Sequence, residues 1–383
     1  MNAAQHIAGE GLYRLLKRKM GWLAGWPAVL AIALALAGCS GDKSPGRTLQ
    51  DAMVKAADIK SYAFKGSLKV EAADIPAGGL PSDGLRQMSA LLALAKNADV
   101  SWTGVYRADP MRMEMNLQIA LKSGAGITVQ LPILMTKDKL WVKIPNLPPI
   151  IPPEAAGKYL EIDGQQLAGQ GKQGAEIPRI DPGESRKFVD DLIRIIAQNV
   201  DEKTYLSSPS LKDAGVPEDA GIDKVVRLRV AKEQAQPFLQ TAAEKIAPAV
   251  LDLLKQNEAY RSLLSLKPEQ VELAGRKLDQ ARSSGDLAKT MEPVYKAVQQ
   301  LDITVDIGID GDGYPSYSLA DVAAKWTAPD GKPASLAFRT TSQQSNINGQ
   351  VKFPSGDGAP TDIVTPDRLS ELLGALAATG SGP

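Results

Sequence analysis

The sequence predicts an α+β fold built on one large antiparallel sheet of about nine or ten strands. Apolar and polar residues alternate over 111–121 and again over 301–309, which is the pattern of a strand with one buried face. Between these two blocks, residues 185–300 carry many apolar side chains at helical spacing. The sequence contains no repeat of fixed length, and this argues against a solenoid or a propeller.

The first half of the chain predicts one capped helix followed by a meander of strands. Thr48 is a candidate N-cap for a helix that runs to about Lys60. A Gly/Pro-rich linker at 76–84 and a short helix at 85–96 separate the first two strands. The expected strands are 61–71, 98–107, 111–121, 127–135, 139–144 and 158–162, with a hairpin across Lys137 and Asp138.

Residues 145–153 contain five prolines among apolar residues. Proline cannot donate to a strand ladder, so the segment predicts an extended loop over a sheet rim. Its apolar side chains fit a packed crossover, and they equally fit a lid or a membrane-touching edge. Both readings stay open.

The second half predicts a helical block and a second group of strands. A helix at 185–199 and a strand at 224–231 come first. Pro237 and Pro268 are expected in the first turns of helices, where proline is tolerated. The further expected elements are helices at 235–256, 268–283, 286–300 and 367–377, and strands at 301–309, 315–326, 335–342 and 345–353.

The first 38 residues have the order of a bacterial secretion signal. Four basic residues lie between Arg14 and Lys19, and an apolar run of about fifteen residues follows, shorter than the ~20 that span a bilayer. The run ends in Leu36-Ala37-Gly38-Cys39, which resembles the lipobox of bacterial lipoprotein precursors. An N-terminal membrane anchor with a chance cysteine is the alternative reading.

The lipobox resemblance implies that Cys39 is the lipidation site. In that family a diacylglycerol is attached to the cysteine sulfur, the chain is cut before it, and the new amino terminus can receive an acyl chain such as palmitate. Residues 1–38 are then a signal peptide, and 39–47 form a flexible tether because they are small and polar. The expected location is the extracytoplasmic face of the bacterial cell membrane, or the outer membrane where the host has two.

Residue usage excludes several kinds of chemistry from such a mature chain. The single histidine, His6, leaves with the signal peptide, and the single cysteine is the acylated Cys39. Zinc or haem sites with Cys or His ligands, Ser-His-Asp triads, thiol nucleophiles and disulfides are therefore excluded. Because 44 basic residues balance 44 acidic ones, we expect no nucleic-acid partner, and we expect no cofactor.

Two short motifs fit loops better than ligand sites. Gly169–Gly174 matches G-x-G-x-x-G, but Pro178 and Pro182 follow where a dinucleotide site needs a helix. The run Asp310–Gly313 resembles half a calcium loop, yet Pro315 stands where an EF-hand needs glycine. We expect a flexible loop at the first motif, a hairpin turn at the second, and no metal site.

Adjacent carboxylates offer the remaining route to catalysis. Asp190-Asp191 and Asp201-Glu202 have the residue types for acid/base chemistry. Both pairs lie at the edges of amphipathic helices, where we expect solvated charges. The serines of 207–210 have lysines nearby but lack the S-x-x-K spacing. The sequence therefore predicts no enzymatic activity.

The alternating strand at 111–121 carries methionines along one face. Methionine is unbranched and polarizable, so a Met-rich face adapts to varied apolar ligands. The row either packs against the long helices as core or faces a hydrophobic ligand. The candidate ligand-binding residues are those of this face and of an expected neighbouring strand: Met111, Met113, Met115, Leu117, Ile119 and Met135.

The order of lipobox, tether, capped helix, Ser61–Gly66 opening a strand, and meander with inserted helices resembles the lipoproteins of the LolA/LppX-like class. Such proteins often carry a Gly-Tyr-Pro hairpin late in the domain, where this chain has Gly313-Tyr314-Pro315. The resemblance covers residues 48–355, and 356–383 form a C-terminal linker and helix. It implies a curved antiparallel half-barrel whose concave side is covered by helices and encloses an apolar cavity. The helical insertion at 235–300 could either cover that cavity or fill it with its own side chains.

This resemblance implies a membrane-anchored extracytoplasmic lipoprotein that binds a lipid or another hydrophobic ligand between sheet and helices. Some members of the class carry acyl chains or lipids between membranes. The alternative is a structural or protein-interaction lipoprotein of the cell envelope with a filled core and no small ligand. The sequence itself names no protein partner. An enclosed apolar cavity favours the carrier, and a filled core favours the scaffold.

Overall fold

A computed structural model provides the structure of the chain. The residues that it describes are 43–76, 92–93, 95–122, 126–148, 150–163, 182–264, 266–284, 292–293, 295–328, 330–356 and 358–380. They belong to two compact units. The first unit takes its residues from Met1–Asp58, Leu68–Ala98 and Glu184–Gln343, and the second from Ile59–Ser67, Asp99–Gly183 and Gln344–Pro383.

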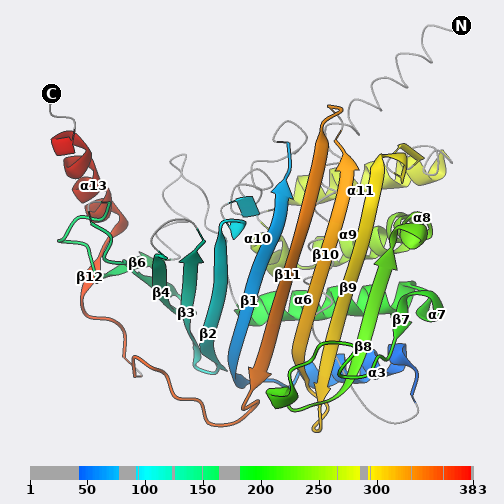
Figure 1. The fold of residues 1–383 in the computed structure, drawn as a ribbon, viewed down its shortest axis with the longest axis horizontal. Helices are drawn as coiled ribbons and strands as arrows, with labels where there is room; N and C mark the ends of the chain where they lie inside the picture. The colour runs from blue at the N-terminus through cyan, green and yellow to red at the C-terminus, as the bar shows by residue number, and fades with distance from the viewer. Residues whose placement is uncertain are drawn as a thin grey trace, which may run out of the picture. The chain divides into compact units, whose positions relative to one another are not determined.

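The described strands form one open, mostly antiparallel 12-stranded sheet, so the predicted α+β class is confirmed. Their order is β12-β6-β5-β4-β3-β2-β1-β11-β10-β9-β8-β7 (Figure 1). The strands are β1 Ser61–Asp74, β2 Ala98–Ala108, β3 Met111–Leu121, β4 Thr128–Thr136, β5 Lys139–Lys143, β6 Tyr159–Asp163, β7 Leu206–Ser207, β8 Ile222–Ala231, β9 Val298–Asp310, β10 Pro315–Thr327, β11 Pro333–Ser345 and β12 Ile363–Val364.

The helices lie before, between and after the strands, as the sequence predicts. They are α3 Pro45–Ala56, α6 Pro182–Asn199, α7 Glu202–Tyr205, α8 Lys232–Thr241, α9 Ala247–Gln256, α10 Glu258–Leu263, α11 Pro268–Ser283 and α13 Pro366–Gly380. Within the described part of the chain, no helix is both long and apolar enough to span a membrane. Residues 77–84 of the expected linker and most of the helix expected at 85–96 lie outside the described residues.

In the first unit, helices pack on one face of β8–β11 (Figure 1). Val305 of β9 lies on this face, opposite Ala320 of β10 and Leu228 of β8. All three side chains are buried. The helix residues in the same core are Leu49, Met53, Phe188, Leu192, Ile193, Ile196, Phe238, Ile246, Val250, Leu251, Leu254, Tyr260 and Val271. The chain's own side chains therefore occupy this sheet–helix interface.

The first of the described helices, α3, begins earlier than the sequence predicts. Ser44 is the N-cap, and its Oγ accepts a hydrogen bond from the N–H of Arg47 at 3.4 Å. Thr48, the predicted cap, is a buried residue inside the helix. The Ser44-Pro45 pair begins the helix because serine caps the free N–H groups and proline fixes a helical φ in the first turn.

The helical block differs from the prediction at three places. Residues 232–256 form one continuous run through α8, a π-helical turn and α9, so Pro237 lies inside a helix and not at its start. The short helix α10 is additional, and its cap Asn257 accepts from the N–H of Tyr260. The predicted end of the helix at 286–300 is wrong, because β9 begins at Val298, which pairs with Trp326 of β10. Ladder partners on β10 outweigh local helical spacing at this point.

The strand expected at 345–353 does not form. After β11 ends at Ser345, Asn346 and Asn348 adopt left-handed φ angles of 52° and 57°, which end the ladder. Asn348 Oδ1 accepts a hydrogen bond from the N–H of Lys60 at 2.6 Å. Residues 346–362, named the C-terminal strap below, show no helix or strand where they are described.

The second unit is a set of successive hairpins closed at one edge by β12 and α13. β3, β4, β5 and β6 pair antiparallel in chain order, and the predicted hairpin at 137–138 is confirmed. β12 adds a short parallel pairing to β6. A small apolar cluster joins the proline-rich loop to α13 through Ile144, Ile151, Ala155, Leu160, Val364, Leu369 and Leu372. Part of the loop is thus a packed crossover, although Ile150 is 68% exposed.

Candidate ligand-binding face

The methionine row lies on β3, in the second unit, and three neighbouring strands extend it. Met113 pairs with Met135 of β4. Met135 pairs in turn with Leu140 of β5, which pairs with Ile162 of β6. Paired residues project to the same side of a sheet. The resulting apolar face comprises Met111, Met113, Met115, Leu117, Ile119, Val129, Leu131, Ile133, Met135, Leu140, Val142, Leu160 and Ile162.

Most residues of this apolar face are partly exposed, and at β6 Leu160 packs against the small apolar cluster that includes α13 residues. The five β3 residues of the face, Met111 to Ile119, are all partly exposed, as are its members on β5 and β6. Met135 is the exception among the six candidate residues, with 7% exposure. The structure therefore places all six on one face. That face belongs to the second unit, whereas the long helices α6, α8, α9 and α11 belong to the first.

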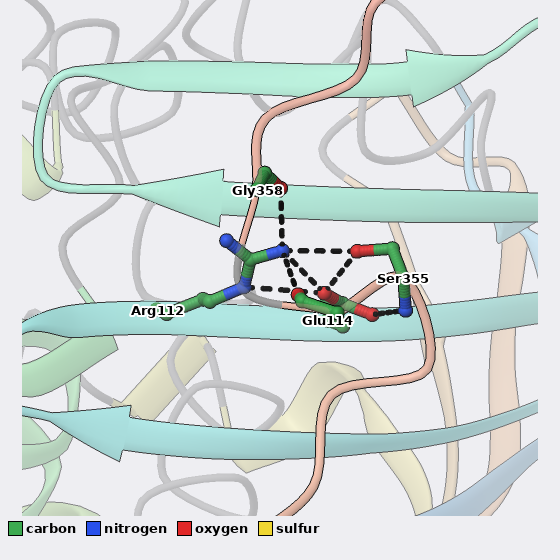
Figure 2. Close-up of polar contacts among 5 residues, drawn as sticks. Arg112, Glu114, Ser355 and Gly358 are labelled. Atoms are coloured by element: carbon green, nitrogen blue, oxygen red, sulfur yellow. Dashed lines mark hydrogen bonds and ion pairs between the residues drawn. The ribbon is translucent and has the colours of Figure 1, made fainter.

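The opposite face of β3 carries two charged residues that are buried, although Gln118 on the same face is exposed. Arg112 is 5% exposed and Glu114 is 7% exposed. The alternation predicts that the polar side of this strand faces water, and that expectation is wrong for Arg112 and Glu114, although it holds for Gln118. The physical reason is the C-terminal strap, which crosses over this face (Figure 2).

Arg112 and Glu114 hold the strap in place through a closed set of hydrogen bonds. Nη2 of Arg112 donates to Glu114 Oε1 at 2.7 Å, Ser355 Oγ at 2.9 Å, and the carbonyls of Gly356 and Gly358 at 2.8 and 3.0 Å (Figure 2). The N–H of Ser355 donates to Glu114 Oε2 at 3.0 Å. A buried charge pair is tolerated only when further hydrogen bonds satisfy it, and the strap supplies them.

Apolar side chains of the sheet and of the strap also lie on this face. Leu134 and Trp141 are paired on β4 and β5 and are 2% and 4% exposed. The ring of Phe353, from the strap, lies 4.9 Å from the guanidinium carbon of Arg107 and 5.0 Å from that of Arg112. Cation–π contacts of this kind add to the attraction between strap and sheet.

A second polar group borders the same side of the sheet at β5 and β6. Lys139 Nζ donates to Glu161 Oε1 at 2.7 Å, and Trp141 Nε1 donates to Oε2 at 2.8 Å. The hydrogen bond from Lys139 holds the pKa of Glu161 below its usual value, and the Trp141 bond lowers it further. Glu161 is therefore a fixed carboxylate that orients its neighbours and not a proton donor near neutral pH.

Comparison with models of protein families gives no match for the chain, and comparison with curated proteins gives none. The function must therefore be inferred from the chain's own residues. Cys39 and the glycine motif at 169–174 lie outside the described residues. Among the residues that the structure describes, no group of three or more His, Cys, Asp or Glu is placed to hold a metal ion.

The Asp310–Gly313 motif forms the predicted hairpin turn between β9 and β10. Asp310 Oδ1 accepts hydrogen bonds from the N–H groups of Asp312 and Tyr314 at 3.1 and 2.8 Å. Gly313 has a φ of 85°, which glycine adopts without strain. The carboxylate of Asp310 thus serves the turn itself.

Asp190, on α6, is not the solvated charge that the sequence predicts. Its Oδ1 is buried without a hydrogen-bond partner in the described structure. Burial raises the pKa of Asp190 to about 7, against the opposing effect of the Arg186 charge. The neighbouring Asp191 accepts a hydrogen bond from Tyr260 Oη at 2.8 Å. Burial and this bond raise the pKa of the Tyr260 phenol well above its usual value.

The sequence predicted the apolar row but not the role of the two polar residues that bind the C-terminal strap to the same strands. Arg112 and Glu114 alternate with the methionines and look like ordinary surface charges. The available signal was their opposite charge at positions i and i+2, which places them side by side on one strand face. Their partner Ser355 lies 241 residues from Glu114, and no local pattern connects the two.

Proposed function

We propose that this chain is a membrane-anchored extracytoplasmic lipoprotein that holds a hydrophobic ligand on the apolar face of β3–β6. The ligand class is a lipid acyl chain or a molecule of similar apolarity. The proposal includes lipidation at Cys39, a half-barrel of the LolA/LppX-like class, and no enzymatic activity.

The supporting observation is the reversed burial on β3. The strap covers the face that carries Arg112 and Glu114, while Met113 and Leu117 on the other face stay partly exposed. Soluble proteins seldom leave large contiguous apolar patches accessible unless another molecule uses them. Each CH₂ group buried there contributes about 0.8 kcal/mol, so an acyl chain laid along several strands gains substantial binding free energy. Flexible methionine side chains adapt to such a chain without a fixed shape.

A second candidate is a protein-interaction lipoprotein of the envelope without a small ligand. The observation that favours it is the packed core of the first unit. Phe238, Ile246 and Leu254, from the helices at 235–300, are buried against the sheet there. In that unit side chains of the helical insertion pack in one core with the strands, and this supports a filled interior.

Lipid extraction and probe binding test the ligand proposal. We expect non-covalent lipid in organic extracts of the purified lipidated protein, and saturable binding of a fluorescent fatty-acid analogue. Leu117→Asp puts a charge on the apolar face and is expected to weaken probe binding about tenfold or more. Gln118→Asp is the matched control, because Gln118 is exposed on the same strand and points to the other side. Its probe binding should equal that of the unmodified protein.

Absence of both lipid and probe binding in the unmodified protein would overturn the ligand proposal and leave the interaction lipoprotein. Equal weakening by Leu117→Asp and Gln118→Asp would mean that the probe binds elsewhere. Urea unfolding of both variants shows whether a loss of binding is a loss of fold. Leu117 is partly exposed, so we expect its variant to remain folded.

A further inference from the structure

The lipid anchor is joined to the first unit by a very short connection. Only five residue steps separate Cys39 from the helix cap Ser44, and these span at most about 17 Å when fully extended. The helix that follows is firmly fixed. Leu49 is 1% exposed, and Ala52 and Ala56 are 0% exposed, in the core of the unit. Whatever holds Cys39 at a bilayer therefore also holds α3 close to it.

The outward side of α3 carries an unusually exposed apolar residue among paired charges. Val54 is 73% exposed, more than any other large hydrophobic residue of the described structure. Asp51, one turn before it, forms ion pairs with Lys43 at 2.6 Å and Arg47 at 3.5 Å. Lys55 Nζ donates to the carbonyl of Asp312 at 2.7 Å. Because these charges are largely satisfied within the protein, this side of α3 has little electrostatic preference for an anionic surface.

We infer that the outward side of α3, with Val54 at its centre, is the surface through which the first unit meets the lipid bilayer. This inference rests on the proposed lipidation of Cys39. The occupant is the bilayer interface because the short tether brings that surface within reach. Val54 then enters the headgroup region, where a single apolar side chain gains burial and the flanking charged side chains stay hydrated. Contact of this origin persists in zwitterionic vesicles and at high salt.

A fluorescent label compared at two sites tests the inference on the complete lipidated protein. The mature chain has no other free thiol, so a cysteine introduced as Val54→Cys is labelled alone with bimane. The control Gln300→Cys is also exposed and lies in the same unit. It is ten residues along β9 from the turn that contacts Lys55, or about 33 Å. Vesicles contain phosphatidylcholine with brominated acyl chains, which quench the label only near the bilayer.

We expect loss of most bimane emission at position 54, no loss at position 300, and no change in either with salt. Insertion of 20 Gly/Ser residues after Gly41 lengthens the tether to a mean span of 25–30 Å by rough estimate and should relieve most of the quenching at 54. Equal quenching at both sites, or none at 54 in protein that floats with the vesicles, would overturn the orientation alone. Protein that does not float at all would overturn the proposed anchor as well.

Discussion

Nη2 of Arg112 lies 2.7 Å from Oε1 of Glu114, two positions along one strand, and both side chains are more than nine-tenths buried. This pair keeps the C-terminal strap on the sheet through Ser355 and the two glycine carbonyls. The strap thereby covers this part of the charged side of β3. The strength of the pair can be measured directly.

Glu114→Ala should destabilise the protein by about 3–5 kcal/mol, because it leaves the Arg112 charge buried without its partner. Urea unfolding followed by circular dichroism gives the free energy. Lys122→Ala is the control: it removes an exposed ion pair with Asp99 at 3.2 Å and should cost less than about 1 kcal/mol. Similar small losses in both variants would mean that the buried pair contributes no more than a surface pair.

Gly104→Ala should also destabilise the second unit. A Cβ at position 104 would stand 2.3 Å from the carbonyl oxygen of Glu114 and 2.5 Å from Cζ of Phe64, so the backbone or the ring must shift. Overpacking of this kind costs about 1–3 kcal/mol. Gly374→Ala, in α13, meets no atom within 4 Å and should instead stabilise its helix by about 0.5–1 kcal/mol. Thermal unfolding of the two variants in parallel should therefore show shifts of opposite sign.

Asp190 should make the stability pH-dependent. Burial raises its pKa from 3.8 to about 7, so between these values the folded state holds a proton that the unfolded state has lost. The contribution of Asp190 to the free energy of unfolding is therefore full below about pH 4 and is lost as the pH rises to about 7. Asp190→Asn should remove this slope and raise stability at pH 8 by about 1–3 kcal/mol.

The control for that experiment is Asp252→Asn, which changes an exposed carboxylate paired with Lys255. Urea unfolding at several pH values from 4 to 8 compares the slopes. The Asp252 variant should keep the slope of the unmodified protein. If Asp190→Asn kept it too, the buried oxygen of Asp190 would not be the origin of the pH dependence.

The proposed lipidation of Cys39 predicts a defined mass for the amino terminus of the processed protein. Mass spectrometry of the membrane-extracted protein should find a chain that begins at Cys39 and carries a diacylglycerol. Cys39→Ser should accumulate as an uncleaved precursor, whereas Ser40→Ala should be processed normally. An unmodified protein that retains residues 1–38 and a free Cys39 thiol would contradict the assignment.

Much of the fold could be predicted because the strands alternate cleanly. The alternation over Met111–Leu121 predicted both ends of β3 correctly, and the turn residues of Asp310–Gly313 predicted the hairpin. The start of β9 at Val298 was missed because its ladder with β10 and β8 is a tertiary effect. The first part of the strap, up to residue 353, was wrongly predicted as a strand, since left-handed asparagines carry no distinctive hydrophobic pattern.

The candidate site was half predictable for the same reason. In the β3–β4 ladder Met135 pairs with Met113. Both strands alternate with a period of two, so the sequence could predict that their apolar residues share one face. Which face of β3 is covered depends on residues far along the chain, and the polar side chains of Arg112 and Glu114 gave the wrong answer when treated as surface. Hydrophobicity alone does not show which face a distant segment will cover.

The separation of 241 residues between Glu114 and Ser355 has a consequence for biogenesis. A chain is synthesised from its amino terminus, so β3 is made long before the segment that neutralises its charged side. Until Ser355 has been made, the incomplete unit has the Arg112 charge without its strap partners on one side of β3 and the methionines on the other. Such an intermediate exposes unpaired polar and apolar groups and is prone to aggregation until the C-terminal strap has been made.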